Sequence, residues 1–239
     1  MFTANNFVFL NESRSIVSTG DWNDPEVEKL WLYNLHYFDD LNAEGSMDRR
    51  EWHAHLIERW IDENPPGYGI GWEPYPSSLR IVNWIKWALS GGELTSRSIA
   101  SLAIQIRFLY EQLEFHLLGN HLLANAKALV FAGLFFEQKE SRKWLDRGLV
   151  ILSRELKEQI LRDGAHFERS PMYHSIILED ILDMENLRCA FGSDEIIKKD
   201  TVEKMWGWFA AMCHPDGDIA FFNDAAFGIA SNLAELNKY

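Results

Sequence analysis

Helical periodicity runs through almost the whole sequence. Apolar side chains recur every three or four residues in one segment after another, which places them on one face of a helix. The clearest run is Ile99, Leu102, Ala103, Ile106 and Leu109. The pattern predicts helices at about 26–42, 48–63, 77–90, 96–118, 121–137, 140–160, 171–190 and 194–213.

Short connections join these segments, so consecutive helices are expected to pack as antiparallel hairpins. Residues 5–10 are expected to form a short extended segment. The tail after residue 213 should contain a turn, a short apolar strand and a second polar turn. At 239 residues the chain is long enough for one large domain or two small ones. The sequence therefore predicts an all-α architecture of helical hairpins.

Composition and charge exclude several classes of function. The net charge of −13 argues against nucleic acid as a partner, because phosphate binding needs a basic surface. An acidic polysaccharide would need local cationic or amide donors in a cleft. No stretch approaches ~20 uncharged apolar residues, so no membrane span is expected, and no signal peptide is visible. Cys189 and Cys213 lack metal-ligand spacing and are expected to be buried free thiols.

The apolar run 113–136 is interrupted by polar residues. Gly119 is expected to end one helix, and Asn120 is expected to cap the next, with His121 beside it. A second polar break, DGAHFERSPMYH, spans residues 163–174. There Ser170 followed by Pro171 predicts a helix start.

Helices two apart in an antiparallel array begin at the same end, so we expect the two breaks to meet in space. Helix starts carry a partial positive charge and free N–H groups. A face made of several helix starts would favour anions. It would also lower the pKa of Tyr173, in the first turn after Ser170, from its usual value of about 10.

The same end should collect two further connections. An aromatic loop at 64–78 carries Trp72 and Tyr75, which are expected to stack on sugar rings. Arg80 follows it and is expected to contact a carboxylate. The loop after the last helix brings His214 and Asp216. Additional substrate contacts are expected from the second break, at His166, Glu168, Arg169 and His174.

Each of these side chains also has an ordinary structural role open to it. Asn120 alone is typical of a helix cap, and His121 of a hydrogen-bonded core or surface histidine. Tyr173 alone suits amphipathic packing. Glu168 and Arg169 suit a surface ion pair. The coincidence of Asn-His and Tyr-His at two helix starts favours a functional interpretation.

Amide, imidazole and phenol groups together suit β-elimination from a uronic acid. Removal of the C5 proton builds a second negative charge on the neighbouring carboxylate, which Asn120 and His121 could stabilise. Tyr or His could take the proton, and the Tyr173 hydroxyl could protonate the departing glycosidic oxygen. Carboxylate-pair hydrolysis stays open, because Glu168, Asp163 and Asp216 are expected at the same end. No nucleophile motif, phosphate loop or metal triad is present.

Five ordered strings resemble the heparinase II/III-like family of polysaccharide lyases, which includes alginate lyases. They are LWLYNLHYF, GWEPYPSSLRIVNWIKW, LLGNHLLANAKALVFAGLFF, DGAHFERSPMYH and HPDGDIAFFNDA, and the resemblance extends over essentially the whole chain. The resemblance implies an incomplete (α/α) toroid, followed in the family by a C-terminal antiparallel β-sheet domain. It also implies that Asn120 neutralises the substrate carboxylate and that His121 assists or acts as base. Tyr173 would be the acid, and in some members both base and acid.

The sequence and the resemblance together predict one toroid domain over residues 1–239, as a fragment of a longer chain. Family members usually take a further catalytic His, and sometimes a structural metal, from the β-sheet domain. Within this chain no cofactor or metal is expected, and the expected partner is an acidic polysaccharide. The family implies a periplasmic or secreted location. The alternatives are a non-catalytic acidic-glycan-binding or scaffold toroid, and a glycoside hydrolase.

Overall fold

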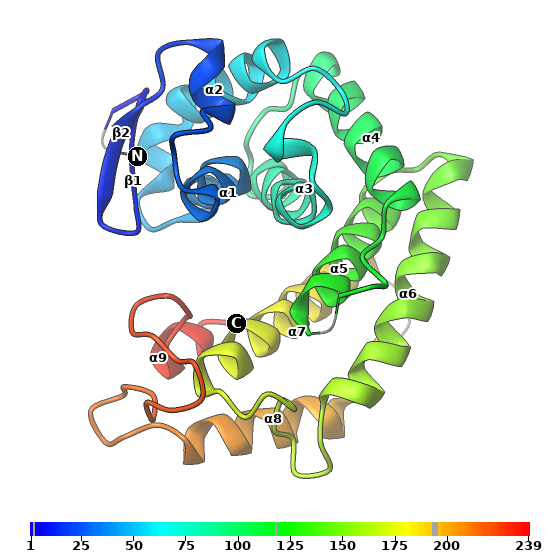
Figure 1. Cartoon of the computed structure of the whole chain (residues 1–239). Helices are drawn as coiled ribbons and strands as arrows, with labels where there is room; N and C mark the ends of the chain where they lie inside the picture. The colour runs from blue at the N-terminus through cyan, green and yellow to red at the C-terminus, as the bar shows by residue number, and fades with distance from the viewer. Residues whose placement is uncertain (2, 118, 193–195) are drawn as a thin grey trace. The chain divides into compact units, whose positions relative to one another are not determined.

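The structure is a computed structural model, which describes residues 1, 3–117, 119–192 and 196–239 (Figure 1). It divides into two compact units, Met1–Glu114 and Phe115–Tyr239. The expectation of a single domain over 1–239 stays a prediction.

The first unit begins with a β-hairpin and continues in helices (Figure 1). Strands β1 (Asn6–Phe9) and β2 (Glu12–Ser15) pair antiparallel, which confirms the expected extended segment. The helices of this unit are η1 (Thr19–Asn23), α1 (Lys29–Tyr37), η2 (Asp39–Asn42), η3 (Ser46–Arg49), α2 (Arg50–Glu63), η4 (Ile70–Trp72), α3 (Pro74–Leu89) and α4 (Ser96–Glu111).

Aromatic side chains form the centre of this first unit. Trp60 is fully buried, and its ring lies 5.8 Å from the rings of both Trp72 and Trp84. Phe38 packs edge-on against two of these rings, with its ring centre 5.6 Å from that of Trp84 and 6.4 Å from that of Trp60. Phe38 also has a left-handed backbone (φ 65°), which ends α1 and turns the chain into η2. The single helix predicted at 26–42 is therefore two shorter ones.

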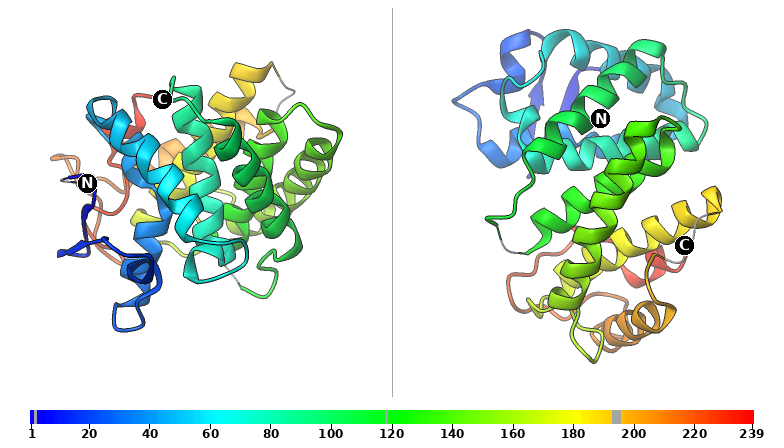
Figure 2. Two further views of the ribbon diagram at one scale, coloured as in Figure 1. Left: turned by 90° about the horizontal axis from the view of Figure 1, so that it is seen from above. Right: turned by 90° about the vertical axis from the view of Figure 1, so that its right-hand side faces the viewer.

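The second unit contains α5 (Asn120–Phe135), α6 (Lys139–Gln159), α7 (Pro171–Phe191), α8 (Lys199–Ala211) and the short α9 (Leu233–Leu236). Helix α5 is buried along almost its whole length, and it packs along α6 and against α7 (Figure 2). A Cβ added at Gly133 would lie 2.5 Å from the Cβ of Leu145 on α6. The absence of a side chain at Gly133 thus lets the two helices approach closely.

Helix α4 ends earlier than the periodicity predicts. It stops at Glu111, although 113–117 continues the apolar pattern, and position 118 lies outside the described residues. Phe115 contacts α6 instead, where the guanidinium carbons of Arg147 and Arg154 lie 5.2 and 5.4 Å from its ring centre. Tertiary contact therefore overrides local periodicity in this connection.

The C-terminal part also differs from the expectation. Helix α8 starts at Lys199, and the predicted positions 194 and 195 lie outside the described residues. The expected apolar strand is reduced to one isolated bridge, between Cys213 and Ile219, and α9 was not predicted. Both cysteines are free, but Cys189 is exposed and Cys213 is only half-buried, so their expected burial was wrong.

Candidate active site

The two polar breaks belong to the second unit and lie against each other. A Cβ built on Gly119 would come within 2.8 Å of Oε1 of Glu168, which places the first break beside the second. Gly119 has φ +86°, a left-handed value that suits glycine. It occupies the N-cap position of α5, so Asn120 is the first helical residue rather than the cap. Helix α5 therefore starts one residue earlier than expected, and the helix end expected at Gly119 was wrong, because α4 already ends at Glu111.

Gln159, the last residue of α6, connects the two breaks. Its Nε2 donates to the carbonyl oxygen of Gly119 at 2.9 Å, and its Oε1 lies 3.1 Å from Nε2 of His166. The same Nε2 also donates to Oε2 of Glu155, at 2.9 Å. Gln159 is buried, although glutamine near a helix end is usually a surface residue. Sequence reasoning missed it because nothing in the local pattern marks this position as internal.

His166 and His174, both within the second break, form a buried pair. The backbone N–H of His166 donates to Nδ1 of His174 at 3.1 Å, and Nε2 of His174 lies 3.0 Å from the carbonyl oxygen of Met205 on α8. With Nδ1 accepting, Nε2 carries the proton, so the ring is neutral. Burial lowers the pKa of each imidazole to about 4. Both side chains are fully buried, and the substrate contacts expected of them do not fit this position.

Tyr173 lies in the first turn of α7, as expected. Its backbone N–H donates to Oγ of the N-cap Ser170 at 3.4 Å, and Pro171 is the first helical residue. The expected lowering of its pKa was wrong in direction. Burial raises the pKa of Tyr173, and the carboxylates of Asp224 and Glu168 raise it further. Desolvation and two nearby negative charges all favour the neutral phenol, which the expectation from the helix start did not include.

A tight turn brings Asp224 to this group. Asn223 and Asp224 both have left-handed backbones (φ 53° and 58°), and Nδ2 of Asn223 donates to the carbonyl oxygen of Arg169 at 3.0 Å. Arg169 is itself left-handed (φ 55°) and exposed. Burial and the charge of Asp224 raise the pKa of Glu168. The sequence signal for this turn was the Asn-Asp pair, since these residues adopt left-handed conformations more readily than others.

Asn120 and His121 occupy the first turn of α5 and are partly exposed. The first N–H groups of a helix lack intrahelical acceptors and carry a partial positive charge. The start of α5 thus combines an amide, an imidazole and backbone donors, next to Glu168. This arrangement can bind an anionic group.

The residues expected from the aromatic loop lie in the first unit. Helix α3 begins at Pro74, so Tyr75 is helical, and it is partly exposed. Trp72 is buried, donates from Nε1 to the carbonyl oxygen of Asn64 at 3.2 Å and packs on Trp60. Stacking on a sugar ring does not fit this buried position.

Arg80 is fully buried in the same core. Its Nε donates to Oε1 of Gln105 at 2.8 Å, and its guanidinium carbon lies 3.9 Å from the ring centre of Trp60. A further donor reaches the carbonyl oxygen of His36 at 3.3 Å. The guanidinium is thus engaged inside the unit, and contact with a substrate carboxylate does not fit.

The family profile described as Heparinase II/III N-terminus matches residues 43–239. The chain belongs to this family. Curated relatives include heparin-sulfate lyases from Bacteroides stercoris, 35% identical over 127 residues, and from Pedobacter heparinus, 32% identical over 117 residues. These matches cover 50% and 45% of this chain but only 18% and 17% of the relatives.

Solved structures of heparinase III and heparan sulfate lyase have a similar fold. A crystal structure of heparinase III matches with a TM-score of 0.60 and 24% identity, over 79% of this chain and 31% of that one. A mutant heparan sulfate lyase from Pedobacter heparinus matches with a TM-score of 0.66 and 22% identity, over 90% and 38%. The predicted fold class, an all-α incomplete (α/α) toroid, is confirmed by these likenesses.

Across the described ranges, no group of three or more His, Cys, Asp or Glu side chains is placed to hold a metal ion. In the same part of the chain, no helix is both long and apolar enough to cross a membrane.

Proposed function

We propose that this chain supplies the toroid portion of a polysaccharide lyase, which cleaves a uronic-acid-containing polysaccharide by β-elimination. One observation carries the proposal: the start of α5, with Asn120 and His121, lies beside the segment that holds Glu168 and Tyr173. Membership of a family with heparin-sulfate lyases among its relatives supports it.

The start of α5 suits the carboxylate of the uronic acid. When the C5 proton leaves, charge develops on that carboxylate, and donors already in place stabilise it without reorganisation. We assign this role to the amide of Asn120, with His121 as a second donor or as the base. The positive end of α5 adds to the stabilisation.

Tyr173 is assigned the role of acid. Its raised pKa keeps the phenol protonated at neutral pH, so that it can donate to the departing glycosidic oxygen. The carboxylates of Asp224 and Glu168 disfavour the phenolate, so a base role for Tyr173 would need a cation nearby. Proton abstraction is therefore assigned to His121 or to a residue outside this chain.

The names of the relatives support a substrate class. Heparan sulfate is the first candidate, because the matched relatives are named heparin-sulfate lyases. The chain spans less than two thirds of those relatives, so activity is attributed to the full-length protein. Alginate is the second substrate to test, since it also presents uronic carboxylates.

The test measures ultraviolet absorbance of unsaturated uronate product, using full-length protein with heparan sulfate, heparin, chondroitin sulfate and alginate. We expect product from at least one of them, and Tyr173→Phe and Asn120→Ala should abolish it. Tyr68→Phe is the matched control, because Tyr68 is 66% exposed in the first unit. Unchanged turnover in both site variants would refute the mechanism.

Two other results would each point to a rival function. Shortened chains without unsaturated ends would identify a hydrolase that uses carboxylates such as Glu168. Binding of acidic oligosaccharide without any product would identify a non-catalytic glycan-binding domain.

A further inference from the structure

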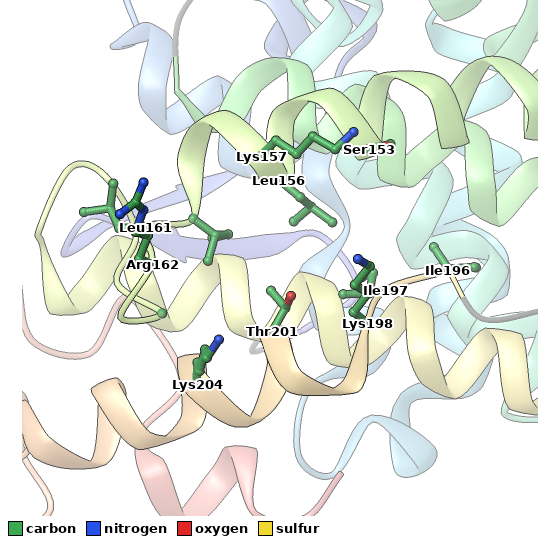
Figure 3. A pocket seen from close by; sticks show the side chains of 12 residues that line it. Ser153, Leu156, Lys157, Leu161, Arg162, Ile196, Ile197, Lys198, Thr201 and Lys204 are labelled. Carbon is green, nitrogen blue, oxygen red and sulfur yellow. The ribbon is translucent and has the colours of Figure 1, made fainter.

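The second unit also contains a hollow that has no part in the site described above. It is a cavity of about 340 Å³ between the end of α6, the turn that follows it, and the start of α8 (Figure 3). Small-molecule sites occupy about 300–1,000 Å³, so this volume is near the lower limit. It suits one or two sugar units rather than a large cofactor.

The charge of this cavity is opposite to that of the chain. Lys157, Arg162, Lys198 and Lys204 line it, and its described lining contains no Asp or Glu, whereas the whole chain has a net charge of −13 (Figure 3). Lys204 is paired with Asp200 at 2.7 Å. The other three make no ion pair with any described residue. Lys157, Arg162 and Lys198 thus lack a counter-charge among the described residues, and a bound anion would supply one.

The rest of the lining is suited to a sugar. Leu156, Ile160 and Leu161 supply apolar surface, and Ser153 and Thr201 supply hydroxyl groups. A bare inorganic ion would use only the cations. A saccharide with sulfate or carboxylate groups would also place its apolar ring face on the leucine and isoleucine side chains.

The cavity lies on a different face of α6 from the candidate active site. Ser153, Leu156, Lys157 and Ile160 follow the three-to-four spacing of one helical face. Glu155 and Gln159, which belong to the network at Gly119, lie on another face of the same helix. A ligand in the cavity would therefore not compete with one at Tyr173.

We infer that this cavity is an auxiliary binding site for an anionic saccharide, namely a sulfate- or carboxylate-bearing unit of the polysaccharide. The identity of the ligand rests on the proposed function, whereas the anionic chemistry rests on the lining alone. The site would hold the polymer to the enzyme while another part of the chain is cleaved. Its contribution should appear with long substrates and vanish with short ones.

Lysine footprinting tests the location of binding. Full-length protein carrying Tyr173→Phe is acetylated with and without a size-defined heparan sulfate oligosaccharide, and each lysine is quantified by mass spectrometry. We expect protection of Lys157 and Lys198, but none of Lys143, an exposed lysine elsewhere on α6. Equal labelling of Lys157 and Lys198 with and without saccharide would overturn the inference. Equal protection by inorganic sulfate at the same sulfate concentration would overturn the assignment to a saccharide.

Paired charge variants test its contribution. Lys157→Gln/Lys198→Gln should weaken binding of a long heparan sulfate chain roughly three- to tenfold, with a shallower salt dependence. Lys139→Gln/Lys143→Gln removes the same amount of charge from α6 outside the cavity. The resulting change in the binding free energy should be less than half of that caused by Lys157→Gln/Lys198→Gln. Equal weakening by both pairs would mean a general charge effect and would overturn the inference.

The same variants separate this inference from the proposed function. Turnover of a disaccharide-length or tetrasaccharide-length substrate by otherwise wild-type enzyme should be unchanged in Lys157→Gln/Lys198→Gln. If Tyr173→Phe retains full turnover, the proposed mechanism fails, while protection of Lys157 and Lys198 would still support the anionic site.

Discussion

The side-chain amide of Gln159 donates to the carbonyl oxygen of Gly119 at 2.9 Å, while its oxygen lies 3.1 Å from the imidazole of His166. One buried residue at the end of α6 thus holds the turn before Asn120 and the loop before Tyr173. The candidate active site depends on a side chain that does not belong to either break.

Replacing Gln159 by Leu should loosen this junction. The carbonyl oxygen of Gly119 and the ring of His166 would both lose a buried partner. Each loss should lower the free energy of unfolding by about 1–3 kcal/mol. We expect lower stability in urea unfolding, and a fall in kcat larger than any rise in KM, because Asn120 and Tyr173 lose their alignment. Glu158→Gln, at the exposed neighbouring position, should change neither quantity. A stability loss without any change in kcat would leave Gln159 a purely structural residue.

Gly119→Ala should destabilise the second unit in two ways, through backbone strain and through a steric contact of the new Cβ. A left-handed φ of +86° costs a non-glycine residue about 1–2 kcal/mol, and the new Cβ would meet Glu168 at 2.8 Å. The Glu168 side chain is flexible, so Gly119→Ala/Glu168→Ala should recover only the contact part, as measured by chemical unfolding. Gly207→Ala on α8 is the control, since nothing lies within 4 Å of its added Cβ and its φ is ordinary. It should be neutral or slightly stabilising.

The sequence predicted the helices and the meeting of the two breaks better than the roles of individual polar residues. Periodicity and the Ser170-Pro171 start located α7 correctly, because these signals are local. Burial is not local: His174 and Arg80 were expected to face substrate, yet both point into cores built by distant segments. Gln159 and Asp224 were missed for the same reason, since their importance arises only from residues brought near them by the fold.

Removing the carboxylates near Tyr173 should lower the pKa of its phenol. Both Asp224 and Glu168 disfavour the phenolate, so Asp224→Asn and Glu168→Gln each favour ionisation. The direction can be measured by ¹³C NMR titration of labelled tyrosine, with Tyr173→Phe to assign the signal. If Tyr173 is the acid, the alkaline limb of the kcat profile should shift to lower pH in both variants. Glu203→Gln on α8, an exposed charge paired with Lys199, should leave both readouts unchanged.

Arg80→Lys should destabilise the first unit without altering substrate affinity. Lysine cannot reproduce the donor to Gln105 together with the stacking over Trp60, and its charge would be buried with poorer partners. We expect a loss of roughly 2–4 kcal/mol in chemical unfolding, because buried charges that lose partners are costly. Arg97→Lys, at a position with 51% side-chain exposure, is the control and should stay within about 0.5 kcal/mol of wild type. A raised KM in folded Arg80→Lys protein would restore the substrate role expected from the sequence.

Acid should destabilise the second unit through His166 and His174. Their folded-state pKa values are lowered to about 4, against about 6.5 in an unfolded chain, so the unfolded state binds more protons between these values. The two neutral histidines therefore make their full contribution to the free energy of unfolding above about pH 6.5. This contribution is lost as the pH drops toward 4, by up to about 3 kcal/mol for each histidine. Urea unfolding at a series of pH values from 7 to 4.5 measures this slope.

His174→Asn is the variant that isolates this effect. It keeps an acceptor near the backbone N–H of His166 but cannot become charged, so it should be less stable at pH 7 and lose less stability on acidification. His116→Asn removes an exposed imidazole from the same unit and should leave the slope unchanged. A slope in His174→Asn equal to that of wild type would show that His174 does not contribute to the acid lability.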